Sequence, residues 1–190
     1  MSLTEQVYAS LRLDILHLHF GENEFLNEAA LAERYSVSKA PLREALHRLC
    51  MEGVLVSYPR KGYLLAPVTQ QEFAHAQQLR LLCEGYAIDL AISAPLEARQ
   101  ALLDGASLPY RMEENSGFHR DLAALSGSRT LLQTVERLLS TVERTLSLRI
   151  QAAGMPPQSA EVHQAIAAAL VRGDAEAAKQ ALAEDLSLSN

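Results

Sequence analysis

Residues 30–55 read ALAERYSVSKAPLREALHRLCMEGVL, and this stretch constrains the fold more than any other part of the chain. Two short helical patterns flank a tight turn here. The second places apolar residues at i, i+3, i+4 and i+7, which makes one stripe along a helix. Its members are Leu42, Ala45, Leu46 and Leu49. Ser38 stands where an N-cap belongs, and Pro41 falls in the first turn, where a missing N–H has no cost. We therefore predict two short helices that pack together.

The opposite face of the second helix is cationic. It carries Lys39, Arg43, His47 and Arg48. A short amphipathic helix with such a face, braced by another helix, fits the major groove of DNA. The alternative interpretation is an ordinary helical hairpin whose charged face is simply solvated.

Two short β patterns follow directly, at residues 54–58 and 63–66. The loop between them is Pro59-Arg60-Lys61-Gly62, so the pair predicts a β-hairpin with a basic tip, which we call the wing. A wing placed after a helix pair favours the DNA-binding interpretation.

Residues 7–68 resemble the winged helix-turn-helix of GntR-type transcription regulators. The resemblance is carried by FLNEAALAERYSVSKAPLREALHRLCMEGVL and PRKGYLL. It implies contacts with double-stranded operator DNA from the recognition helix and the wing, at Ser38, Lys39, Arg43, Arg60, Lys61 and Gly62. One departure is Ala29, where the FadR-like branch often has an arginine, so we expect one contact to be missing and the operator to differ.

The distribution of charge agrees with this surface, although the net charge is −6. Residues 34–61 carry six Lys or Arg against Glu44 and Glu52, whereas residues 1–33 carry one Arg against six acids. The local potential rather than the total charge steers DNA binding.

Composition favours an all-helical protein in the cytoplasm. Apolar residues make up 48% of the chain and aromatic residues only 5%, with no Trp. We find no run of apolar residues long enough to span a membrane and no signal peptide. Cys50 and Cys83 lack metal-type spacing, and we expect both to be buried free thiols in a reducing compartment.

Capping signals divide the chain into two domains. Ser2 and Glu5 form a capping box that opens a first helix, expected to continue to about Leu18, and Asn27 is a good N-cap for the next. Thr69 begins a second capping box, T-Q-Q-E, after a short linker. We predict a mainly α protein: a winged helix-turn-helix over residues 1–68, then an antiparallel bundle of five or six helices over 69–190, with a loop at 105–112.

Polar residues come together in the expected bundle. His119 lies four residues after Asn115, so both share a helix face. His163 and Asp185 lie about ten and twelve residues on either side of Gly173, so a helical hairpin turning there brings them to nearly the same height. Bundle cores can hold metals through such side chains. Alternatively, each histidine is a lone core or surface residue.

Residues 73–187 resemble the FCD effector domain of FadR-like regulators, through LRLLCEGYAIDLA, FHRDLAALSG and VHQAIAAALVRGDAEAAKQAL. The resemblance implies a divalent-metal site at Asn115, His119, His163 and Asp185. Two positions depart from the usual pattern, since Asn115 replaces an aspartate and Asp185 replaces a histidine. The remaining two histidines and one carboxylate suit zinc, nickel or manganese, with open positions for a ligand carboxylate. A metal-free site whose histidines bond the effector directly is the alternative.

The resemblance also implies a small carboxylate as effector, and we expect Arg80 to point inward and clamp it.

The leading hypothesis is a ligand-responsive transcription regulator, with repression as the commoner outcome, acting as a homodimer on a pseudo-palindromic operator. A metal-dependent enzyme using the two-histidine, one-carboxylate site is the alternative, but no nucleophile elbow, phosphate loop or HExxH pair is present in the sequence. A third possibility is a DNA-binding module whose bundle only dimerises.

Overall fold

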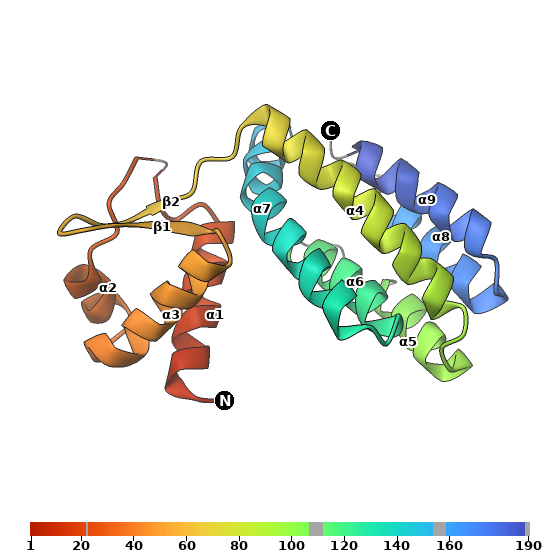
Figure 1. Cartoon of the computed structure of the whole chain (residues 1–190), viewed down its shortest axis with the longest axis horizontal. Coiled ribbons are helices and arrows are strands. Elements are labelled where there is room, and N and C mark those ends of the chain that lie inside the picture. Colours follow the sequence, from red (N-terminus) through yellow and green to blue (C-terminus); the bar gives the residue numbers. More distant parts are fainter. Residues whose placement is uncertain (22, 107–111, 154–158, 189–190) are drawn as a thin grey trace.

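The computed structural model describes residues 1–21, 23–106, 112–153 and 159–188. It consists of an N-terminal head and a helical bundle, joined by the segment between β2 and α4 (Figure 1). The head contains α1 (Leu3–Leu16), α2 (Glu28–Arg34), α3 (Lys39–Met51), β1 (Leu55–Tyr58) and β2 (Gly62–Leu65). The bundle contains α4 (Gln70–Ala91), α5 (Leu96–Ala106), α6 (Met112–Leu125), α7 (Arg129–Ala153), α8 (Ser159–Arg172) and α9 (Ala175–Leu188).

The head is built around the predicted apolar stripe. All four stripe residues of α3 are buried, and they share one core with buried residues of α1, namely Val7, Leu11 and Ile15. Because burial of such side chains is the main favourable term in folding, these two helices fix the position of the cationic face of α3.

The wing forms as predicted. Strands β1 and β2 pair antiparallel, from Leu55 opposite Leu65 to Tyr58 opposite Gly62. Leu26 forms an isolated antiparallel β-bridge with Tyr63 of β2. The two backbones exchange two hydrogen bonds, of 2.7 and 3.0 Å. The wing is thereby tied to the segment that leads into α2.

Both predicted capping boxes are present, at Ser2 and at Thr69, and Asn27 caps α2 by accepting from the Ala29 N–H. Ser38 occupies the N-cap position of α3, but its side chain makes no capping hydrogen bond in the described structure. The hydroxyl of Ser38 is therefore left exposed at the start of α3.

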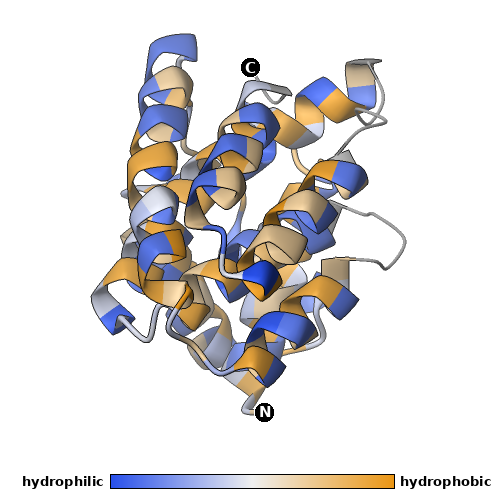
Figure 2. Cartoon of the chain, turned by 90° about the vertical axis from the view of Figure 1, so that its right-hand side faces the viewer, coloured by the Kyte–Doolittle hydropathy of each residue, from blue (hydrophilic) through white to orange (hydrophobic). Residues whose placement is uncertain are grey.

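The bundle contains six helices within the described residues. Helix α4 packs against α6, α7 and α9, and α8 and α9 form an antiparallel hairpin that turns at Gly173. Gly173 has a φ of +78°, which favours glycine at a helix C′ position. Figure 2 shows apolar and polar segments on the same helices, as expected for amphipathic helices around a shared core.

Three details differ from the predictions. Helix α1 ends at Leu16 instead of near Leu18, because Leu18 adopts a left-handed φ of +60°. Helices α5 and α6 both extend into the expected loop at 105–112, whose residues 107–111 lie outside the described part. Cys50 and Cys83 are free thiols but only half-buried, because each lies at the margin of its apolar core.

None of the helices, as far as the structure describes them, has the length and apolar character needed to cross a membrane.

Candidate functional site

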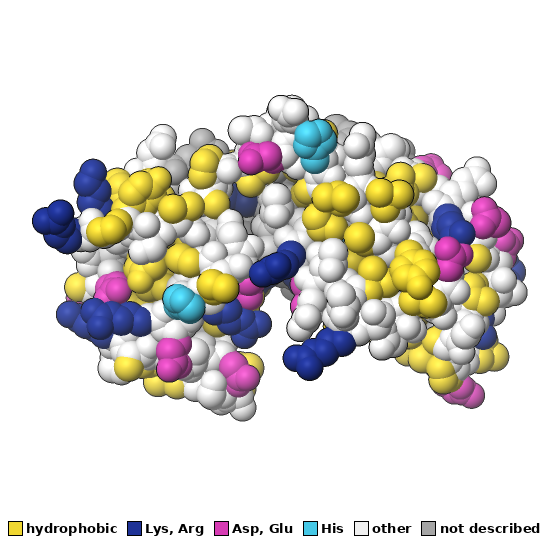
Figure 3. All heavy atoms as spheres, viewed as in Figure 1, with side chains coloured by type: hydrophobic (Ala, Val, Ile, Leu, Met, Phe, Trp, Pro, Cys, Tyr) yellow, Lys and Arg dark blue, Asp and Glu magenta, His cyan; other side chains and the backbone are white. Residues whose placement is uncertain are grey.

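The cationic face of α3 is exposed. Lys39, Arg43, His47 and Arg48 all lie on the surface, and Lys and Arg side chains gather over the outer part of the head in Figure 3. The Arg43 Nε donates to Glu28 Oε2 over 2.7 Å, and Tyr63 donates to the other oxygen of Glu28 over 3.3 Å. Residues of α2, α3 and the wing therefore meet at one carboxylate.

The tip of the wing presents the two predicted basic residues to solvent. Arg60 has a φ of +65°, and the ammonium of Lys61 lies 5.8 Å from the centroid of the Phe25 ring. Gly62 has a φ of +109°, and a Cβ at this position would lie 2.4 Å from the carbonyl oxygen of Leu26. Gly62 therefore has a structural reason to be glycine, beside the DNA contact predicted for it.

The buried polar cluster lies in the bundle, where α6, α8 and α9 bring together His119, His163 and Asp185. One potential ligand atom from each lies within 4.8 Å of the other two. The Nε2 atoms of His119 and His163 lie 3.2 and 3.3 Å from the two oxygens of Asp185. All three side chains are at most 5% exposed.

The fourth predicted ligand, Asn115, is also buried. It lies one helical turn before His119 on α6, with 7% of its surface exposed. Helix α6 thus supplies two of the four predicted positions, as their spacing required.

Helix α4 supplies a group that the sequence reasoning missed. Glu84 is fully buried and its Oε2 lies 2.6 Å from the Nδ1 of His119. Its other oxygen accepts from the Nε of Arg80 over 2.8 Å, and Arg80 in turn donates to Gln77 over 2.9 Å. Arg80 points inward, as predicted, and is 1% exposed.

The charges of the cluster stabilise one another. Burial alone raises the pKa of Glu84, but the Arg80 guanidinium and His119 lower it below its ordinary value. Burial opposes the imidazolium of His119, but the Glu84 carboxylate raises the pKa of that ring. Burial lowers the pKa of His163. Burial likewise raises the pKa of Asp185, but hydrogen bonds from the two histidines have the larger effect and lower it below its ordinary value. Both carboxylates are therefore ionised at neutral pH.

Several buried polar atoms on the helices that form this cluster lack a hydrogen-bond partner among the described residues: Gln77 Nε2, Arg80 Nη2 and Ser116 Oγ. An unsatisfied buried donor costs about 1–3 kcal/mol, so native proteins rarely leave several together. A bound ligand, ion or ordered water fits this concentration of unsatisfied groups.

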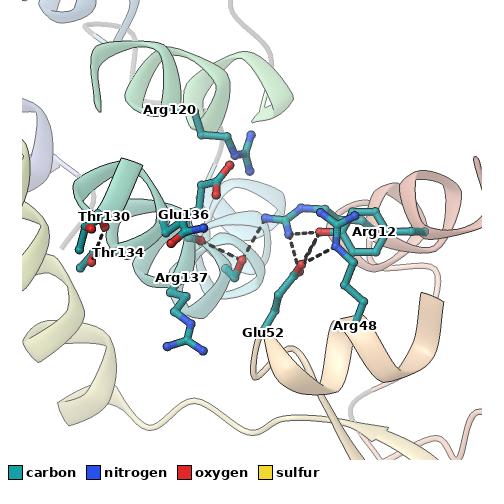
Figure 4. A pocket seen from close by; sticks show the side chains of 11 residues that line it. Arg12, Arg48, Glu52, Arg120, Thr130, Thr134, Glu136 and Arg137 are labelled. Atoms are coloured by element: carbon teal, nitrogen blue, oxygen red, sulfur yellow. Dashed lines mark hydrogen bonds and ion pairs between the residues drawn. The ribbon is translucent and has the colours of Figure 1, made fainter. Parts of the chain in front are cut away.

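A second feature is a cleft of about 720 Å³ between head and bundle (Figure 4). It is lined by Tyr8, Arg12, Arg48, Glu52, Arg120, Thr130, Gln133, Thr134, Glu136, Arg137 and Ser140. It shares no lining residue with the buried polar cluster. The Arg12 guanidinium spans it, because Arg12 contacts Glu52 of the head over 3.1 Å and donates to Ser140 of α7 over 3.2 Å.

The fold and the surfaces together define a winged-helix DNA-binding head attached to a helical bundle with a buried polar site. The family model for bacterial regulatory proteins of the gntR family matches residues 3–65, and the FCD domain model matches residues 78–188. The chain therefore belongs to the GntR family of bacterial regulators and carries an FCD domain.

Relatives across nearly the whole chain are transcription regulators. The HTH-type transcriptional repressor GlaR of Escherichia coli is 28% identical over 94% of this chain and 90% of its own. The HTH-type transcriptional repressor RspR of Escherichia coli is 23% identical over 97% and 86%. The solved structure of E. coli McbR/YncC has the same fold, with a TM-score of 0.81 and 24% identity over 99% of this chain and 95% of that one. The chain is accordingly a DNA-binding transcription regulator and not an enzyme.

Proposed function

We propose that this regulator is a ligand-responsive repressor that acts in the cytoplasm. Residues 1–68 bind operator DNA, and residues 69–190 form a homodimer and bind a small carboxylate together with a divalent metal. The two recognition helices of a homodimer suit half-sites one helical turn apart. Repression is proposed because relatives such as GlaR and RspR are repressors.

The observation that carries the metal site is the convergence of His119, His163 and Asp185 from three helices to within 4.8 Å. Two imidazole nitrogens and one carboxylate suit zinc, nickel or manganese. The side-chain carbonyl of Asn115 is proposed as a fourth, weaker ligand.

Glu84 supports this assignment. A metal-binding histidine commonly donates its other ring N–H to a carboxylate, which fixes the ring and its tautomer. The contact of 2.6 Å between Glu84 and the Nδ1 of His119 has that geometry and leaves Nε2 for the metal. A bound metal offers open coordination positions to the carboxylate of an effector.

The effector carboxylate is supported by the unsatisfied donors of α4. Gln77 Nε2 and Arg80 Nη2 are donors only, whereas an ionised carboxylate is an acceptor only. We propose that Arg80, still held by Glu84, binds the effector through the N–H groups of Nη2.

Elemental analysis tests the metal site, on untagged protein purified without chelator. We expect near-stoichiometric metal in the wild type and in His75→Ala, an exposed histidine of α4 that serves as control. His119→Ala and His163→Ala should lose it. Absence of metal from the wild type, even after soaking with zinc, nickel and manganese, would refute the metal site and favour histidines that bond the effector directly.

Selection of operators from a random duplex library, followed by binding titrations, tests the DNA surface. Lys39→Ala and Arg43→Ala should weaken operator binding, whereas Arg172→Ala, an exposed arginine of the bundle, should not. Unchanged binding in both head variants removes the contact assignment. The other proposed contacts are Ser38, Arg60, Lys61 and Gly62.

A thermal-shift screen of small carboxylates tests the effector. A ligand that binds only the folded state raises the melting temperature, and it must also change operator affinity if the two sites are coupled. No hit across a broad panel favours a bundle that serves dimerisation alone. Light scattering on the protein as it elutes from a size-exclusion column determines whether the homodimer exists.

A further inference from the structure

We propose that Glu28, with Tyr63 behind it, is a specificity-determining positioning residue that orients Arg43 to read a guanine. This inference rests on the proposed DNA contact of Arg43. The observation is the contact between Arg43 Nε and Glu28 Oε2, at 2.7 Å, on an otherwise exposed face. The side chain of Arg43 is 62% exposed and that of Glu28 only 25%.

Glu28 is itself held in place. It is the first residue of α2, where the helix dipole favours a carboxylate, and its second oxygen accepts from the Tyr63 hydroxyl over 3.3 Å. Tyr63 belongs to β2, whose backbone is paired with Leu26 just before that helix. The carboxylate is thus fixed from two sides before Arg43 reaches it.

The atom used by Glu28 decides what the guanidinium can still do. With Nε occupied, both Nη groups of Arg43 remain, and they form the fork that binds guanine O6 and N7. A mobile arginine has to become ordered on binding, whereas one already held in its plane loses less freedom. An exposed ion pair contributes little to folding, so stabilising the head does not account for this arrangement.

The negative charge of Glu28 makes the inference testable, because its two possible roles predict opposite effects of its removal on DNA binding. As a mere surface acid, Glu28 repels phosphates, and Glu28→Gln should tighten binding to every sequence alike. As a positioning residue, its loss should weaken binding to the operator relative to random DNA.

The experiment measures binding affinity for operator and for random duplexes. The proteins compared are the full-length wild type, Glu28→Gln, Tyr63→Phe and Glu33→Gln. Glu33 is an exposed acid of the same helix and serves as the matched control. We expect Glu28→Gln to lower the ratio of operator to random affinity about tenfold. Tyr63→Phe should lower it less, and Glu33→Gln should leave it unchanged. Replacing the contacted guanine by 7-deazaguanine should abolish the difference between wild type and Glu28→Gln.

The failures are distinguishable. If Arg43→Ala weakens operator binding but Glu28→Gln preserves the ratio, the positioning role is wrong and the proposed DNA contact stands. If Arg43→Ala leaves operator binding unchanged, both are wrong.

A different observation carries a second inference: we infer that an ionic bridge across the cleft couples the buried polar cluster to the recognition helix. It rests on the proposed metal site. Arg120, the residue after His119 on α6, donates to Glu143 Oε1 of α7 over 2.6 Å. Arg12 of α1 donates to the other oxygen of Glu143, also over 2.6 Å.

The bridge continues to α3. Arg12 also contacts Glu52 over 3.1 Å, and Glu52 is the C-cap of the recognition helix. Glu52 further accepts from Arg48 of that helix over 3.0 Å and from the Tyr8 hydroxyl over 2.7 Å. Figure 4 shows the contacts of Glu52 with Arg12 and Arg48 at the edge of the cleft.

Burial distinguishes Glu143 from an ordinary surface acid. Its side chain is 9% exposed, and it is shared by an arginine from each domain. A displacement of α6 on ligand binding therefore acts on the contact that holds the head. Such a two-state contact is what coupling between separate sites requires.

The test compares operator affinity of zinc-loaded and chelator-stripped protein, with Glu136→Gln as control, because Glu136 lines the same cleft from the same helix. We expect about a tenfold effect of zinc in the wild type and in the control, and less than twofold in Glu143→Gln with zinc still bound. Small-angle scattering of stripped Glu143→Gln should also show a larger radius of gyration than the stripped wild type, a readout that needs no metal.

A variant that keeps both the coupling and the compact dimensions refutes the bridge. Zinc that binds the wild type without changing operator affinity also refutes it, while leaving the metal site intact. Zinc that does not bind at all refutes the metal site and the coupling together.

Discussion

Replacing Gly62 by alanine tests how the wing is held against the rest of the head. Gly62 begins β2 and has a φ of +109°, a backbone conformation that residues with a Cβ rarely adopt. The added Cβ would lie 2.4 Å from the Leu26 carbonyl oxygen and 3.2 Å from its carbon. These are backbone atoms, so no side-chain rotation relieves the overlap.

The expected magnitude follows from two costs. The strained backbone costs about 1–3 kcal/mol for a residue with a side chain. Moving Leu26 away weakens its two backbone hydrogen bonds with Tyr63, each with a net value of about 1 kcal/mol. We therefore predict that Gly62→Ala lowers the free energy of unfolding of the head by about 3 kcal/mol.

Gly53 provides the matched control. It has a φ of +77°, but an added Cβ would meet no described atom within 4 Å. Gly53→Ala should therefore have only the cost of a left-handed residue, roughly 1–2 kcal/mol. The difference between the variants isolates the overlap with Leu26.

Urea unfolding of the full-length variants measures both values. Four of the six tyrosines, at positions 8, 35, 58 and 63, lie in the head, so tyrosine fluorescence mainly follows that domain, while circular dichroism mainly follows the bundle. The midpoint should shift without a change in slope. Equal destabilisation by the two variants would refute the overlap, and loss of DNA binding by a fully stable Gly62→Ala would mean that Gly62 is glycine for the DNA contact alone.

Three further predictions concern the cluster and the head. Glu84→Gln should weaken metal binding about 10- to 100-fold in chelator competition, because His119 loses the carboxylate that orients it; unchanged affinity contradicts that role. Asn115→Asp should strengthen metal binding in the same assay, because a second carboxylate joins the site, and weaker binding would place position 115 outside the coordination shell. Burial raises the pKa of Asp14, but the Tyr35 hydrogen bond and neighbouring charges lower it below its ordinary value. Asp14 therefore contributes stability above about pH 4 that is lost as the pH falls. Asp14→Asn should make the free energy of unfolding fall less steeply with decreasing pH in this acid range. An unchanged pH dependence of the free energy of unfolding would rule out this role of Asp14.

Local patterns predicted much of this fold because they report local physics. The apolar stripe of α3, the capping boxes and the turn at Gly173 each depend on residues within a few positions of one another. The spacing of His163 and Asp185 about that turn was enough to predict their meeting, because an antiparallel hairpin fixes the heights of its residues.

The burial of Glu84 could not be predicted from such local patterns. Arg80 and Glu84 are four residues apart, a spacing typical of a solvated ion pair on a helix surface. Only the rotation of α4, set by its packing on α6, α7 and α9, makes the pair buried. The bridge from Arg12 to Glu143 joins residues 131 positions apart, and no local pattern indicates such a contact.

The buried array of Arg80, Glu84 and His119 is difficult to explain as a device for stability. Desolvation of such charges often exceeds their mutual attraction, and apolar residues of the same volume commonly do as well or better. The adjacent layer of the bundle is apolar in this way, because Ile88, Leu122 and Leu170 are fully buried there in one core. The array also leaves Arg80 Nη2 unsatisfied, which adds a further cost. A site that must receive a charged ligand explains both costs, because the ligand supplies the missing acceptor and the array holds His119 ready for it. On this argument, removing all three charges together should stabilise the empty bundle while abolishing its response to metal and carboxylates.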